Sequence, residues 1–206
     1  MNPRRVYLVA EDSLGLALGR RLLREGPGLE VFRDANARGS GALRRDVHRY
    51  NAMALNGIPV VMLTDLDRSP CPAALIDRWL GARAPRHPEF LLRVCVREAE
   101  AWVLADPGPI AGLLELRTDA IPREPEKLAD PKAELLRLAE RAPSAVRRRL
   151  RPRPGSRAII GPDYNEDLAI LIEERWDPAE AARRAPSLQR ARHRIDELRR
   201  NRLGTA

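Results

Sequence analysis

The sequence is poor in the residues that build metal fingers, disulfide frameworks and stacking surfaces. Cys71 and Cys95 are the two cysteines among 206 residues, and they have neither a CxxC spacing nor a histidine pair nearby. This pattern excludes a zinc finger and a disulfide framework, so we expect both thiols to be reduced. Aromatic residues make up only 4% of the chain, which argues against a surface that stacks single-stranded bases.

Long apolar runs are also missing. No stretch approaches the roughly 18 apolar residues needed to cross a bilayer, and the opening MNPRR leads into a strand pattern without the apolar core of a signal peptide. We therefore expect a cytoplasmic protein without membrane contact. The hydrophobic fraction of 44% is still enough to fill a core, mainly with leucine, alanine and valine.

Lysine is scarce as well, although the formal net charge is +8, because 35 of the cationic residues are arginine. Seven arginines and no acid lie in the segment 141–157. Such a run is a candidate surface for contacts with nucleic-acid phosphates, with Arg147, Arg148 and Arg149 at its centre. A solvated helix face followed by a proline-rich linker is an equally good interpretation.

The first half of the chain alternates between strand and helix patterns. Strands are predicted at 6–10, 29–32, 58–64 and 90–96, and helices at 14–25, 42–55 and 73–80. The consecutive apolar residues of 58–64 are typical of a strand buried on both faces. This order predicts an α/β fold, with a mainly parallel, Rossmann-like sheet flanked by helices.

Beyond residue 97 the pattern predicts helices alone. They are expected at 98–104, 110–116, 131–141, 165–175 and 187–202, with an irregular segment at 152–161. Asp130 is expected to cap the third of these helices, with Pro131 at its first position. We therefore predict an α/β domain at 1–116 and a basic, α-helical C-terminal extension at 117–206 that packs on it.

Carboxylates follow three of the predicted strands: Glu11 and Asp12, then Asp65 and Asp67, then Glu98 and Glu100. The carboxyl ends of parallel strands meet at one edge of a sheet, so these side chains are expected to converge. In an extended segment Asp65 and Asp67 would also point the same way. Crowded carboxylates raise one another's pKa unless a cation neutralises them, which suggests a hard cation such as Mg²⁺. Turn and cap roles are the alternative for the aspartate pair.

Five segments support a resemblance to a known family: VAED at 9–12, LTDLD at 63–67, VREAEAWVLAD at 96–106, DPK at 130–132 and GPDYN at 161–165. A glutamate after the first strand and Asp-x-Asp after the third resemble the Toprim domain of topoisomerases, primases and overcoming-lysogenisation-defect nucleases. The whole chain is similar to a bacterial Toprim-like family of unassigned function, often encoded near ATPases in defence-type gene clusters. The sequence departs from the Toprim pattern at Asp12, usually a glycine, and at Gly15, often a carboxylate.

The resemblance implies a nuclease, a phosphodiesterase that uses Mg²⁺ or Mn²⁺ and contacts the backbone of DNA or RNA. It implies that Glu11, Asp65 and Asp67 bind metal and act in catalysis, with Glu98 or Glu100 completing the ligand set. One or two metal ions would be held there.

Two basic residues complete this predicted site. Lys132, in the first turn of its helix, would stabilise charge on the transferring phosphate, unless it only pairs with a nearby acid such as Asp130 or Glu134. Arg97 would hold a substrate phosphate in a bidentate contact, or else be a structural partner for Glu11 or Asp65.

Two other functions remain open. A non-catalytic, Toprim-derived regulatory or effector subunit would dock on an ATPase, and Gly15 and the absence of a P-loop motif favour dependence on such a partner. A haloacid-dehalogenase-like phosphatase is the third candidate, because VMLTDLDRS at 61–69 resembles its nucleophile motif, in which Asp65 would be phosphorylated. The position of this motif on the third strand speaks against it.

Overall fold

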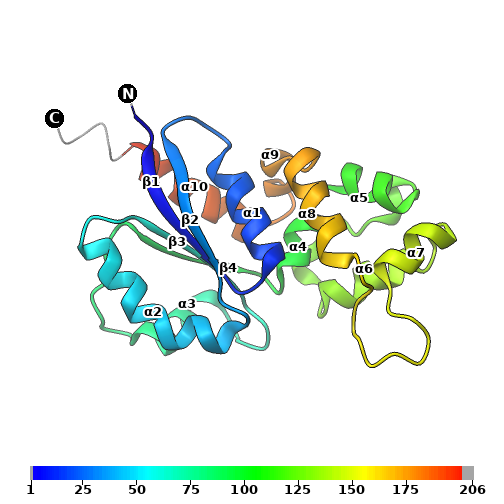
Figure 1. Cartoon of the computed structure of the whole chain (residues 1–206), viewed down its shortest axis with the longest axis horizontal. Coiled ribbons are helices and arrows are strands. Elements are labelled where there is room, and N and C mark those ends of the chain that lie inside the picture. Colours follow the sequence, from blue (N-terminus) through cyan, green and yellow to red (C-terminus); the bar gives the residue numbers. More distant parts are fainter. Residues whose placement is uncertain (1, 201–206) are drawn as a thin grey trace.

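The computed structural model describes residues 2–200, which form a four-stranded sheet surrounded by helices (Figure 1). All neighbouring strands are parallel, in the order β2-β1-β3-β4. The strands are β1 (Arg4–Ala10), β2 (Leu29–Asn36), β3 (Val60–Asp65) and β4 (Phe90–Cys95). The predicted α/β fold with a parallel sheet is therefore confirmed.

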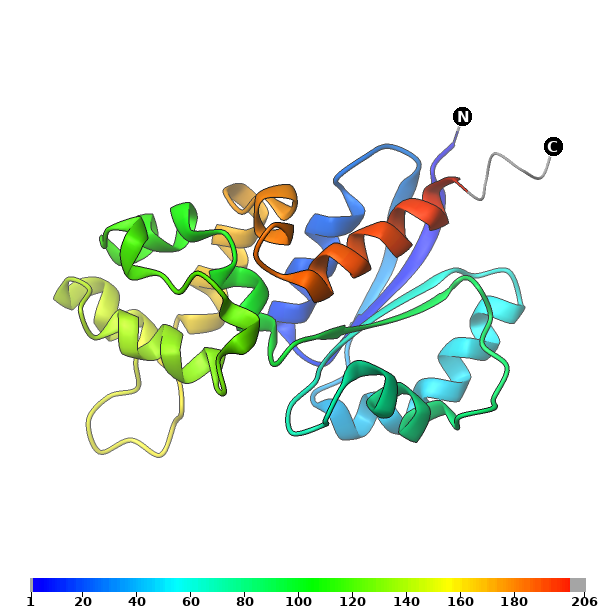
Figure 2. The ribbon, with the colours of Figure 1, turned by 180° about the vertical axis from the view of Figure 1, so that it is seen from behind.

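Helices cover both faces of the sheet, which explains the unbroken apolar runs in its strands. On one face lie α1 (Ser13–Leu23) and α10 (Pro186–Arg200), and on the other lie α2 (Ser40–Leu55) and α3 (Pro72–Leu80) (Figures 1 and 2). Successive residues of β3 alternate between two hydrophobic cores, with Val61 and Leu63 in one and Val60 and Met62 in the other. Each of these side chains is at most 1% exposed.

A helical part follows directly after β4 and lies beyond the carboxyl end of that strand (Figure 2). Its elements are α4 (Ala99–Leu104), α5 (Pro107–Leu114), the 3-10 helices η1 (Thr118–Ala120) and η2 (Pro125–Lys127), α6 (Pro131–Ala139), α7 (Ser144–Leu150), α8 (Tyr164–Glu174) and α9 (Pro178–Ala182).

The helical part and the sheet share one hydrophobic core. Helix α8 packs along α1, and α10 returns to pack against β4. The fully buried Trp102 of α4 illustrates this continuity, because its indole nitrogen donates to the hydroxyl of Ser187, on α10, at 2.7 Å. Residues from both halves of the chain thereby fix the position of α4 beside the sheet.

Several predicted boundaries are wrong. Helices α7 and α9 are not predicted by the sequence pattern, because α7 buries only Leu150 fully and α9 is only five residues long, so neither has a strong apolar period. Helix α5 begins at Pro107, with the Pro-Gly-Pro segment in its first turn, where proline is tolerated because the N–H is not needed. Residues 201 and 202, at the end of the helix predicted over 187–202, lie outside the described residues.

Candidate functional site

The carboxyl edge of the sheet brings Glu11 to Asp65. Glu11 follows β1, Asp65 is the last residue of β3, and these strands are neighbours. The Glu11 Oε2 atom accepts hydrogen bonds from the hydroxyl of Thr64 at 3.0 Å and from the backbone nitrogen of Asp65 at 3.5 Å. A carboxylate from the first strand thus lies directly over the end of the third.

Both acids lie where a negative charge is costly. Burial, then repulsion by Asp67 and Asp12, raises the pKa of Glu11 against the opposing effect of the Thr64 hydrogen bond. The pKa of Asp65 lies well above its usual value, first because of burial and then because of nearby carboxylates, chiefly Glu100 and Glu11. A cation at this edge would relieve that repulsion.

Asp67 departs from the expected geometry. The strand ends at Asp65, and Asp67 has a φ of 48°, so the extended backbone assumed for the Asp-x-Asp pair is wrong. The turn is held by the carbonyl of Arg97, which accepts from the backbone nitrogens of Leu66 and Asp67, both at 3.0 Å. Alternation along a strand therefore cannot be used to orient Asp67 relative to Asp65.

The two departures from the Toprim pattern have structural roles here. Asp12 caps α1, since its Oδ1 accepts from the backbone nitrogen of Gly15 at 2.9 Å. A Cβ atom on Gly15 would lie only 2.9 Å from the Cβ of Ala10. Helix α1 approaches β1 too closely at this point for a carboxylate side chain at position 15.

Helix α4 is bound to the same edge through Asp65 and Glu98. The Asp65 Oδ1 atom accepts from the backbone nitrogen of Ala99 at 2.8 Å, and Glu98 Oε2 accepts from that of Lys132 at 3.0 Å. These two carboxylates therefore also hold the starts of α4 and α6 against the sheet.

Glu100 and Lys132 form a partly buried ion pair. Lys132 Nζ lies 3.4 Å from Glu100 Oε1, which also accepts from the Tyr164 hydroxyl at 3.0 Å. Burial raises the pKa of Glu100, and the charge of Lys132 opposes this shift. For Lys132, burial lowers the pKa, but the carboxylates of Glu100, Glu98 and Asp65 raise it overall. The expected cap at Asp130 is present, but Lys132 pairs with Glu100 rather than with Asp130 or Glu134.

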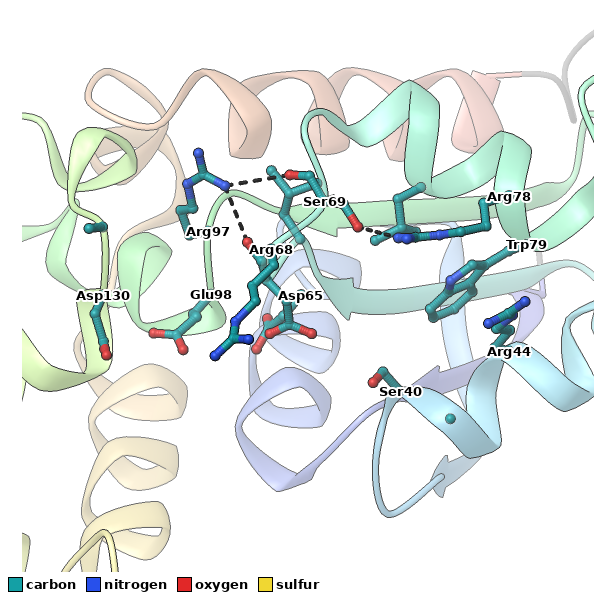
Figure 3. A pocket seen from close by; sticks show the side chains of 15 residues that line it. Ser40, Arg44, Asp65, Arg68, Ser69, Arg78, Trp79, Arg97, Glu98 and Asp130 are labelled. Carbon is teal, nitrogen blue, oxygen red and sulfur yellow. Dashed lines mark hydrogen bonds between the residues drawn. The ribbon is translucent and has the colours of Figure 1, made fainter.

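An open pocket of about 650 Å³ lies beside these groups. Figure 3 shows Asp65, Glu98 and Asp130 on the acidic part of its wall. Its other charged lining residues are Asp67, Arg44, Arg68, Arg78 and Arg97. The sequence pattern did not single out three of these arginines as binding residues. Arg44 and Arg78 lie beside other charged residues on amphipathic helices, and Arg68 stands out only within the phosphatase-like motif.

Arg97 supports the loop that carries the aspartates. Its Nη1 atom lies 3.2 Å from the carbonyl oxygen of Asp67 and 3.4 Å from that of Ser69, and the Val96–Arg97 peptide is cis. The expected ion pair with Glu11 or Asp65 is not formed within residues 2–200. Arg97 lines the pocket while it holds the loop after β3.

Arg147, Arg148 and Arg149 lie on α7 and do not line the pocket. Arg149 pairs with Asp167, whose side chain is buried, and lies 3.6 Å from a carboxylate oxygen of Asp163. The run without acids in the sequence is thus partly neutralised by acids from α8 and from the turn before it.

The donor set fits a divalent cation in part. In the described part of the chain no three histidine, cysteine or acidic side chains are arranged to hold a metal ion. Mg²⁺, however, is commonly held by one or two carboxylates together with waters and substrate phosphates. Glu11 and Asp65 meet that smaller requirement, because their carboxylates lie at one edge and repel each other.

No protein-family model, curated protein or solved structure matches this chain. The resemblance to the Toprim-like family therefore stays a prediction. Over residues 2–200 no helix has the length and apolar character that a membrane crossing requires.

Proposed function

We propose that this chain is a metal-dependent phosphodiesterase of the Toprim type, a nuclease that acts on DNA or RNA. The observation that carries the proposal is the meeting of Glu11 and Asp65 at the carboxyl edge of the parallel sheet, beside a pocket with both acidic and arginine side chains. Ligands of open α/β sheets bind at this edge. Carboxylates suit a hard cation and arginines suit phosphate, so the pocket has the two kinds of group that phosphodiester cleavage needs.

Bound Mg²⁺ or Mn²⁺ would supply the Lewis acid that activates water and polarises the phosphoryl oxygens. Glu11 and Asp65 would hold the cation. Glu98 fits as a further ligand better than Glu100, because Glu98 lines the pocket and Glu100 is only 2% exposed. Asp67 lines the pocket next to them.

Lys132 would provide a fixed positive charge for the leaving oxygen. Its side chain is 31% exposed, and the surrounding carboxylates raise its pKa, which keeps the ammonium protonated at neutral pH. Glu100 and Tyr164 act in this scheme as positioning residues, since Glu100 bridges the Lys132 ammonium and the Tyr164 hydroxyl. Arg97 positions the loop of Asp67 through its carbonyl contacts.

The test is a cleavage assay with supercoiled DNA, linear DNA and RNA in Mg²⁺, Mn²⁺ or EDTA. We expect metal-dependent strand cleavage that is lost in Glu11→Gln and in Asp65→Asn. Glu30→Gln is the matched control, because Glu30 is an exposed carboxylate near the opposite end of β2. Absence of cleavage with every substrate and metal would refute the proposal. Release of phosphate from a monoester without strand cleavage would instead favour the haloacid-dehalogenase-like phosphatase.

A second candidate is a non-catalytic regulatory or effector subunit that docks on an ATPase. One observation favours it. Three carboxylates of the site accept hydrogen bonds from backbone nitrogens and so help to stabilise the fold, namely those of Asp65, Glu98 and Glu11. Metal titration by calorimetry separates the two functions. Saturable Mg²⁺ or Mn²⁺ binding that disappears in Asp65→Asn supports the nuclease, whereas no binding supports the subunit.

A further inference from the structure

The pocket beside the carboxylates has a basic half. Arg44 on α2 and Arg78 on α3 lie toward the end away from Glu98, Arg68 in the loop after β3 lies beside Asp65, and Arg97 lies on the side of Glu98 (Figure 3). Within residues 2–200 none of these four arginines takes part in an ion pair. Arginines elsewhere do pair with acids, as Arg192 does with Glu25. Among the residues that the structure describes, the four acids that line the same pocket do not form ion pairs with these arginines, so the guanidinium groups can still bind an anionic ligand.

Two of the four arginines are anchored to the loop between β3 and α3. Arg97 contacts the carbonyl oxygens of Asp67 and Ser69, and Arg78 donates to the Ser69 hydroxyl. The other two, Arg44 on α2 and Arg68 just after Asp67, are exposed, and their side chains form no hydrogen bond within the described part of the chain. Their guanidinium donors are therefore available to a ligand, while Arg78 and Arg97 hold the loop between β3 and α3 in position.

The start of α2 closes the same half of the pocket. Ser40 and Gly41 line it, and no side chain in the described residues caps this helix. The backbone nitrogen of Gly39 donates to the carbonyl of Glu11 at 2.9 Å, which fixes the helix start directly beside the acidic edge. The positive end of the helix dipole adds to the field of the arginines.

The two halves lie in sequence along the pocket. In Figure 3, Asp130, Glu98 and Arg97 lie at one end, Arg44, Arg78 and Ser40 lie toward the other, and Asp65 with Arg68 lies between them. A polyanionic strand laid along this line would meet the cation at the carboxylates first, then Arg68, and then Arg44 and Arg78.

We infer that Arg44, Arg68 and Arg78 form a second phosphate subsite, which binds the backbone phosphate next to the one that the cation would hold at the carboxylates. This inference rests on the proposed function and specifies its substrate as a nucleic-acid strand with at least two successive phosphates. Arginine is suited to the task because its planar fork binds phosphate oxygens in pairs. A mononucleotide would fill only one of the two subsites.

The test measures binding of fluorescein-labelled DNA and RNA hexanucleotides by anisotropy, in EDTA and at several salt concentrations, so that cleavage plays no part. We expect Arg44→Ala and Arg68→Ala each to weaken binding about tenfold and to lower the slope of log affinity against log salt by about 0.7. Arg83→Ala is the matched control, because it removes the same charge from an exposed residue outside the pocket. It should change affinity by less than about twofold.

A second arm locates the phosphate. In a series of hexanucleotides, one phosphate at a time is replaced by a neutral methylphosphonate. The unmodified protein should bind one member of the series more weakly than the others, and Arg44→Ala should bind that member as well as the rest. Wild-type affinity and salt slope in both arginine variants would overturn the subsite, while metal-dependent cleavage would leave the nuclease proposal standing. Arginine-dependent binding without cleavage in Mg²⁺ or Mn²⁺ would uphold the subsite and refute the nuclease.

Discussion

Lys132 and Glu100 join the start of α6 to α4 through an ion pair in which Nζ lies 3.4 Å from Oε1. The carboxylate of Glu100 is buried, whereas the ammonium keeps contact with solvent. The pair thus places one of the two lysines of this chain close to the carboxylates of Glu98 and Asp65.

Glu100→Gln should destabilise the fold, because it leaves the partly buried ammonium of Lys132 without its closest carboxylate. We expect a loss of about 1–2 kcal/mol in the free energy of unfolding, less than for a fully buried pair because Lys132 is partly exposed. Urea unfolding of Glu100→Gln, Lys132→Met and the double variant measures it. If the two losses simply add, the pair contributes nothing to stability.

Asp65→Asn should abolish Mg²⁺ or Mn²⁺ binding without unfolding the chain. The substitution removes a repelled charge, and the amide oxygen can still accept from the backbone nitrogen of Ala99. We expect an unchanged or higher melting temperature in EDTA, measured by circular dichroism, together with loss of the calorimetric metal signal. A marked drop in melting temperature without metal would identify Asp65 as a structural residue.

The stability of the metal-free chain should depend on the charge of Glu11 and Asp65. Folding raises both pKa values above the usual 4.5 and 3.8, so the folded state binds more protons than the unfolded state once the pH exceeds those values. Stability from these groups is therefore fully present below about pH 4 and is lost as the pH rises through the raised pKa values.

Urea unfolding in EDTA, compared between the wild type and Asp65→Asn, isolates this effect from the other carboxylates. The wild type should lose stability relative to the variant as the pH increases, and added Mg²⁺ should reverse the loss. A difference between the two proteins that does not change with pH would contradict the raised pKa of Asp65.

Replacing Arg147 and Arg148 with alanine should weaken nucleic-acid binding equally for all sequences. Each replaced arginine that binds a phosphate should reduce the slope of log affinity against log salt concentration by about 0.7 to 0.9. Arg149 stays unchanged in this variant, because its removal would also leave Asp167 without its partner. An unchanged salt slope would assign the α7 surface to solvent or to a protein partner, and the ATPase-docking subunit would then become the better candidate.

The sequence alone was enough to predict the parallel sheet and the edge at which the acids gather. The unbroken apolar run of β3 is a local signal of burial on both faces, and an acid that follows a parallel strand has its place set by topology. The positions of Glu11 and Asp65 at one edge therefore follow from patterns within short segments.

The sequence did not reveal which partner each charged side chain takes. The extended backbone assumed through Asp67 failed at a turn held by the carbonyl of Arg97, which follows a different strand. The pairing of Lys132 with Glu100 depends on the packing of α6 against α4. The basic half of the pocket forms only because α2 and α3 both lie next to the loop after β3. Hydrogen bonds and ion pairs require groups within a few ångströms. Only the tertiary structure sets such distances between residues far apart in the chain.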